Sequence, residues 1–182
     1  MKHKLPLVTL LPDEIALARQ YDDELKSLGI AVDGTDPWHL RAAGDRFFYG
    51  YLGELAFGAY LTICGVIYQH RITLDGHSDA PEFKVVMDGH WRSLDVKTAT
   101  NPTHQLMAQP ARQALDADIY VGVRARSESQ FEIWGWMPLE EWSEVPLRDL
   151  GLGVPTRACR LDELADIESL VERLDTVRRV RR

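Results

Sequence analysis

The stretch PEFKVVMDGHWRSLDVKTAT, residues 81–100, decides the fold of this chain. The pair Asp88-Gly89 separates two runs that are rich in β-branched and aromatic residues, and Asp-Gly in this setting is a strong hairpin signal. With these two residues as the turn, the sequence predicts two antiparallel strands in which Glu82 faces Asp95.

One face of the predicted hairpin is charged and the other is apolar, because side chains alternate between the two faces of a strand. The apolar face, which we expect to pack on the core, consists of Phe83, Val85, Met87, Leu94 and Val96, with Arg92 near the tip. The charged face consists of Glu82, Lys84, Ser93, Asp95 and Lys97.

Two carboxylates side by side destabilise a hairpin, and a divalent cation such as Mg²⁺, which takes oxygen ligands, would reverse that cost. Lys97 adds positive charge and can position or help deprotonate a water at such a cation, which is chemistry suited to attack on a phosphodiester. The alternative is that Lys97 simply neutralises Glu82 and Asp95 in a surface ion-pair cluster. The pattern alone leaves both interpretations open.

The segment 45–64 is predicted to be a buried helix, since it is apolar nearly all round. Between Arg46 and Arg71 its only fully charged side chain is Glu54. A buried carboxylate is costly unless it is paired, hydrogen-bonded or bound to a metal. The alternative is a helix end or edge where Glu54 reaches water.

The remaining pattern predicts an α/β (α+β) fold with a central mixed β-sheet of about five strands flanked by helices. The other expected helices are 12–28, 103–117, a short turn at 138–142, and 161–179. The other expected strands are 66–74, 118–125 and 130–137. We expect a single domain over 1–182, with a helix and connector at 1–44, an αβββαββ core at 45–137, and a C-terminal helical extension with a basic tail at 138–182.

Composition is ordinary for a globular protein, with 45% hydrophobic and 27% charged residues. The net charge of −7 argues against coating nucleic acid by bulk electrostatics, but it does not exclude a nuclease. Cys64 and Cys159 lie far apart and suggest free thiols in a reducing cytoplasm. We expect neither a signal peptide nor a membrane span, because the longest apolar segment, 47–69, carries Glu54 and several glycines.

Other candidate residues are weaker. Trp134, Trp136 and Trp142 could stack on bases, although core packing suits their spacing better. The histidines His70, His77 and His90 lack zinc spacing with the cysteines. His104 could approach phosphate or the site, although an ordinary surface histidine is the preferred interpretation. The basic end RRVRR is interpreted as a solvated tail rather than a phosphate-contacting arm.

The motif PE-x12-DVK, with a hairpin between its halves, resembles the signature of the PD-(D/E)xK nuclease superfamily, which has the restriction-endonuclease-like fold. The preceding helix with Glu54 and the following segment QPARQALDADIYVGV are also similar to that family. The resemblance covers roughly residues 45–125, continues into QFEIWGWMPLEEW, and is closest to small bacterial and phage members.

The resemblance implies that Glu82 and Asp95 are metal ligands, with the main-chain carbonyl of Val96 as a third ligand. It also implies that Lys97 is the catalytic lysine and that Glu54 is an outer ligand or holds a metal-bound water. The expected cofactor is Mg²⁺ or Mn²⁺. One departure is Glu82, where the family most often has Asp, and Asp79 is a fallback ligand.

These expectations amount to a Mg²⁺-dependent nuclease that hydrolyses DNA phosphodiester bonds in the cytoplasm, with DNA as partner and a homodimer allowed by analogy with the family. One alternative is a catalytically silent module of the same fold with a binding or structural role. Another is an unrelated α+β domain with a chance motif. The sequence leaves endonuclease or exonuclease action and the sequence preference open.

Overall fold

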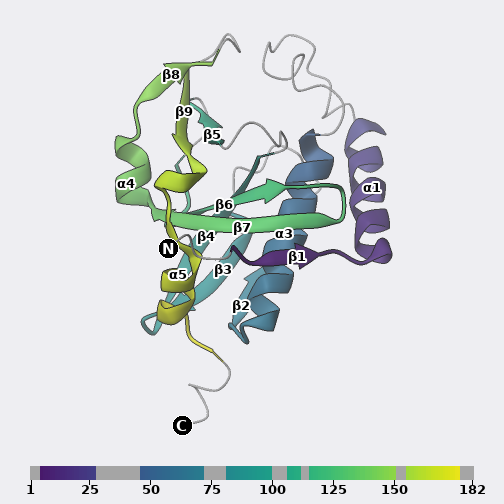
Figure 1. The fold of residues 1–182 in the computed structure, drawn as a ribbon, viewed down its shortest axis with the longest axis horizontal. Coiled ribbons are helices and arrows are strands. Elements are labelled where there is room, and N and C mark those ends of the chain that lie inside the picture. Colours follow the sequence, from purple (N-terminus) through teal and green to yellow (C-terminus); the bar gives the residue numbers. More distant parts are fainter. Residues whose placement is uncertain are drawn as a thin grey trace.

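The computed structural model describes residues 5–27, 46–71, 81–99, 106–111, 115–150 and 155–176. These ranges form a mixed α/β structure with one large sheet, one small sheet and four helices, so the predicted fold class is confirmed at this level (Figure 1). The connector at 30–44, Asp79, His77, His104 and the basic tail lie outside the described residues.

The large sheet is mixed and has the spatial order β1-β7-β6-β4-β3-β2. Its strands are β1 (Leu7–Thr9), β2 (Tyr68–His70), β3 (Phe83–Met87), β4 (His90–Ala99), β6 (Ile119–Ala125) and β7 (Gln130–Pro138). The short β10 (Ala165–Asp166) also pairs with β7. All neighbours are antiparallel except β4 and β6, which are parallel. Neither β1 nor β10 was expected from the sequence.

The predicted hairpin is confirmed, with Met87 paired to His90, Lys84 to Ser93 and Phe83 to Leu94. Asp88 and Gly89 both have positive φ, 52° and 79°, as the two central residues of a type I′ turn require. The turn sets which residues face each other, so the register follows from the local sequence alone.

Helix α3 (Arg46–Ile63) covers one face of the sheet, with α1 (Pro12–Ser27) packed beside it and α5 (Ile167–Arg173) on the same side (Figure 1). This confirms the two N-terminal helices. Phe57 of α3 packs edge-on against Phe83 of β3, with ring centroids 5.5 Å apart. Gly53 lets α3 approach β4 closely, since a Cβ there would collide with the side chain of Thr98.

The small sheet is built from β5 (Leu106–Pro110), β9 (Pro155–Arg160) and β8 (Leu147–Asp149) and belongs to a second core. This core also contains Tyr120 of β6 and Trp142 of α4 (Leu139–Glu144). The predicted helix at 103–117 is therefore wrong over 106–111, and it is wrong over 115–117 as well, while the rest of that range lies outside the described residues. Met107 and Gln109 are buried at strand spacing, because β5 gains a hydrogen-bonding partner in β9.

The predicted helix at 161–179 is confirmed as an α-helix only over 167–173 and is wrong over 164–166 and 174–176, while 177–179 lie outside the described residues. A 3-10 turn (Leu161–Glu163) and β10 precede α5, whose start is capped by the side chain of Asp166, which accepts from Glu168 N at 3.1 Å. Leu161 packs in the second core while Ile167 and Leu170 pack in the first. The apolar residues at helical spacing in this segment therefore pack into two different hydrophobic cores.

Candidate active site

The hairpin brings Glu82, Asp95 and Lys97 together where β3 begins. Asp95 and Lys97 lie two residues apart in β4, on the same face as Tyr120 of β6, to which Asp95 is paired in register. Glu82 directly precedes β3, and its Oε2 accepts a hydrogen bond from Val96 N at 3.1 Å. The Glu82 carboxylate thus reaches β4 beside Asp95.

Asp95 and Lys97 form a largely buried ion pair. The distance from Lys97 Nζ to Asp95 Oδ2 is 2.6 Å, and the two side chains are 20% and 7% exposed, respectively. The other oxygen, Asp95 Oδ1, is buried and has no hydrogen-bond partner among the described residues. Such an oxygen is costly to bury, so this position has unmet capacity for a cation or a proton donor.

Glu54 projects from α3 and has a partner that sequence reasoning missed. His70 Nε2, at the end of β2, lies 3.3 Å from Glu54 Oε2, and both side chains are mostly buried. The His70 ring stacks flat on Phe83, with a centroid distance of 4.3 Å and an interplanar angle of 1°. Only the pairing of β2 with β3 brings His70 to Glu54, so no local sequence signal could have identified it.

The three carboxylates share one electrostatic environment. Burial raises the pKa of Glu82 well above its usual value, and the nearby charges of Asp95 and Glu54 raise it further, while Lys97 opposes them. Burial also raises the pKa of Glu54, against the effect of its bond to His70. Three acidic groups therefore gather around one lysine, and the site favours an added positive charge.

Lys97 stays protonated in this setting. Burial acts to lower its pKa, but Asp95 and Glu82 together outweigh that effect, so the pKa of Lys97 is raised. Tyr120 lies beside the pair, and burial followed by the charge of Asp95 raises the pKa of its phenol. The ammonium group is therefore available as a charge and a hydrogen-bond donor, not as a base.

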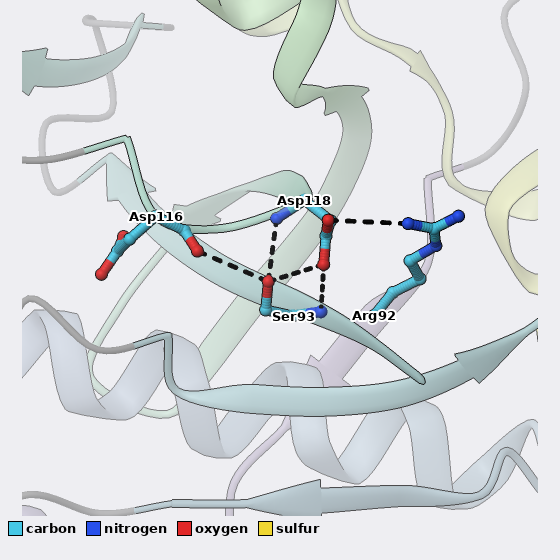
Figure 2. Close-up of polar contacts among 4 residues, drawn as sticks. All are labelled: Arg92, Ser93, Asp116 and Asp118. Atoms are coloured by element: carbon cyan, nitrogen blue, oxygen red, sulfur yellow. Dashed lines mark hydrogen bonds and ion pairs between the residues drawn. The ribbon is translucent and has the colours of Figure 1, made fainter. Parts of the chain in front are cut away.

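Polar contacts join Ser93 of β4 to Asp118, which directly precedes β6 (Figure 2). The backbone N and the Oγ of Ser93 each donate to Asp118 Oδ2 at 2.7 Å, and Asp118 N donates back to Ser93 Oγ at 3.0 Å. Arg92 Nη1 lies 3.7 Å from Asp118 Oδ1. The site thus rests on side-chain contacts as well as on the strand ladder.

The donor set suits a hard divalent cation, because it offers carboxylate oxygens, of which the buried Asp95 Oδ1 has no partner in the described ranges. However, no three His, Cys, Asp or Glu side chains of the described ranges are placed to hold a metal together. Asp95 pairs with Lys97, Glu82 with Val96 N–H, and Glu54 with His70. A cation at this site would compete with these contacts for the carboxylate oxygens.

The three tryptophans that were candidates for stacking on bases, Trp134, Trp136 and Trp142, are buried or partly buried. Trp136 and Trp142 are buried, and their indole nitrogens donate to Ser169 Oγ at 2.9 Å and Gln109 Oε1 at 2.8 Å. Trp134 is partly buried and donates to Glu132 at 3.1 Å. Trp91, which sequence reasoning did not single out, is 52% exposed.

Both cysteines are free thiols, as expected from their spacing. None of the helices in the described ranges has both the length and the hydrophobicity that a membrane span needs.

Comparison of the chain with protein-family models, curated proteins and solved structures finds no match.

Proposed function

We propose that this chain is a Mg²⁺- or Mn²⁺-dependent nuclease of the restriction-endonuclease-like fold that hydrolyses DNA phosphodiester bonds. The observation that carries the proposal is the buried cluster of Asp95, Lys97 and Glu82 on one hairpin, joined by Glu54 from α3. A merely structural ion pair would need one carboxylate for one lysine, whereas this cluster has three.

Asp95 and Glu82 are the proposed ligands of the cation, with Glu54 outside them and the Val96 carbonyl as a further ligand. When bound, the cation supplies a Lewis acid and neutralises phosphate charge. Lys97, released from its contact with Asp95, would orient the attacking water and stabilise the negative charge that develops on the phosphate. His70 would hold the Glu54 carboxylate in place.

The topology supports the proposed fold in part. A buried helix, α3, precedes the β3–β4 hairpin, and β4 lies parallel to β6 after a crossover. One departure is that the crossover contains the strand β5 over 106–110 where the family resemblance led us to expect a helix.

The test is cleavage of plasmid and single-stranded oligonucleotide substrates in Mg²⁺, Mn²⁺ or EDTA. We expect metal-dependent cleavage by the wild type, and a loss of about 100-fold or more in Lys97→Ala, the order reported for removing one charge-stabilising donor. Arg148→Gln, which removes an exposed cation on β8, is the matched control and should cut normally. Cleavage that persists in EDTA or in Lys97→Ala contradicts the mechanism.

The second candidate is a catalytically silent module of the same fold with a binding or structural role. It is favoured by the lack of three pre-placed ligands in the described ranges and by the net charge of −7. Titration calorimetry with Mg²⁺ and Mn²⁺ separates the two, because the nuclease must bind the metal. Absence of both metal binding and cleavage would favour the silent module. A homodimer is part of the nuclease proposal and is checked by sedimentation.

A further inference from the structure

We propose that the solvent face of strands β2, β3 and β4 binds a single-stranded stretch of DNA that leads to the carboxylate cluster. We call this surface the hairpin face, and it consists of Gln69, Arg71, Lys84, Trp91 and Ser93. The inference rests on the proposed nuclease function and adds to it the form of the substrate.

The hairpin face is continuous with the candidate site. Gln69 pairs with Lys84, and Lys84 pairs with Ser93, so these three residues form one row across the strands. The next residue on this face of β4 is Asp95, about 7 Å from Ser93 at ~3.3 Å per residue. Arg71 N donates to Glu82 O at 2.7 Å, which places Arg71 beside Glu82.

Most residues of the hairpin face are exposed, whereas described side chains cover the neighbouring part of the sheet. Near Gly122 of β6, the side chains of Leu161, Leu164 and Met107 pack directly over the sheet. On the hairpin, Gln69, Arg71 and Lys84 are exposed, and Trp91 is 52% exposed. On the opposite side of the same strands, Phe83, Val85 and Leu94 are fully buried.

The hairpin face carries two cations, Arg71 and Lys84, on its exposed surface. Arg71 and Lys84 form no ion pair with any described residue, although Arg19, Arg124, Arg126, Arg160 and Arg173 all have acidic partners. The unpaired cations flank Glu82 on two sides, about one pleat repeat (~7 Å) away along β3 in the case of Lys84. Free cations beside a phosphodiester-cleaving site suit the phosphates that adjoin the cut.

Trp91 supplies the second element of a strand-binding surface. It lies about 13 Å from Asp95 along β4, on the same face and beyond Lys84, at ~3.3 Å per residue. A cationic path with an exposed aromatic ring is how proteins bind single strands, because every unpaired base offers a flat face for stacking. In a duplex the bases are already stacked on each other, so Trp91 favours an unpaired strand.

The test is anisotropy of a fluorescein-labelled oligodeoxythymidylate, titrated with protein in EDTA so that no cleavage occurs. We expect Trp91→Ala to weaken binding about 5- to 150-fold, which corresponds to loss of one stacked base. Trp91→Phe keeps a ring and should recover most of the affinity. Lys84→Gln and Arg71→Gln should each lower the slope of log K against log salt by about 0.7.

Arg148→Gln again serves as the control, since Arg148 is an exposed cation on the separate small sheet. If Trp91→Ala and Lys84→Gln bind the oligonucleotide with affinities within twofold of that of Arg148→Gln, the hairpin face is not the binding surface. Equal affinity for a duplex of the same length would overturn its single-strand preference. Binding without any cleavage in Mg²⁺ would refute the nuclease and leave the hairpin face standing, so the two failures are distinguishable.

Discussion

Replacing Lys97 by Met removes the one cation of the cluster and should destabilise the protein in a pH-dependent way. Lys97 Nζ lies 2.6 Å from Asp95 Oδ2, and the Asp95 side chain is only 7% exposed. Removing one partner of a buried ion pair costs ~3–5 kcal/mol. Because Lys97 itself is 20% exposed, we expect the lower end, about 3 kcal/mol near pH 8 in EDTA.

The cost should shrink at lower pH. The pKa of Glu82 is already raised by burial and by Asp95, so Glu82 takes up a proton readily once Lys97 is gone. A group with a raised folded-state pKa contributes stability below its unfolded pKa, and that stability is lost as the pH rises through the folded value. The loss caused by Lys97→Met should therefore fall to about half near pH 5, since protonation relieves the repulsion.

Glu82→Gln is the matched partner in a double-mutant cycle, because glutamine keeps the acceptor for Val96 N–H without the charge. Alone, it should stabilise the metal-free protein by about 1 kcal/mol near pH 8, and combined with Lys97→Met it should recover about 2 kcal/mol, because the repulsion it removes is larger without the lysine. The assay is urea denaturation followed by circular dichroism in EDTA. A Lys97→Met variant as stable as wild type near pH 8, or additive effects of the two changes, would refute the buried cluster.

Three further predictions concern single residues. His70→Ala should weaken Mn²⁺ binding about 10- to 100-fold in calorimetry, because Glu54 loses the hydrogen bond that positions it. His70→Gln should restore most of the Mn²⁺ affinity. Equal affinity in the wild type and both variants would contradict this role of His70. Gly53→Ala should lower the free energy of unfolding by about 1–2 kcal/mol, because the added Cβ would collide with Oγ1 and carbon atoms of Thr98. This collision should outweigh the better helix propensity of alanine. Unchanged or raised stability would show that α3 can move away from β4. Burial raises the pKa of Cys159 to about 11, so its thiol should react with a disulfide reagent about 100-fold more slowly than a free thiol near pH 8. The stability that the neutral thiol contributes should be lost only as the pH rises from about 9 through 11. Fast labelling of the folded protein would contradict the burial of Cys159.

Most of the candidate site could be predicted because its main parts are close in the chain. Asp88-Gly89 sets the turn, and the alternation of the flanking residues sets which side chains face the core. Lys97 beside Asp95 follows from their spacing of two residues in one strand. The nuclease function itself stays a proposal, since it depends on a cation that would compete with the existing contacts of the carboxylates.

The small sheet could not be predicted from local patterns. Residues 103–117 carry residues of good helix propensity, yet 106–110 form a strand because β9, about 50 residues later, offers a ladder of hydrogen bonds. Similarly, the apolar residues at 161–170 have helical spacing, but Gly135 leaves room for the backbone of Ala165, so β10 forms against β7 instead.

The sequence by itself determined the hairpin, its register and the placing of Asp95 and Lys97 on one face, because these depend on turn geometry and on the two-residue period of a strand. Only the tertiary structure decided that His70 meets Glu54, that Ser93 bonds to Asp118, and that Trp91 stays exposed. Those outcomes depend on contacts between segments that are far apart in the chain. The energies of such contacts cannot be estimated from a local sequence pattern.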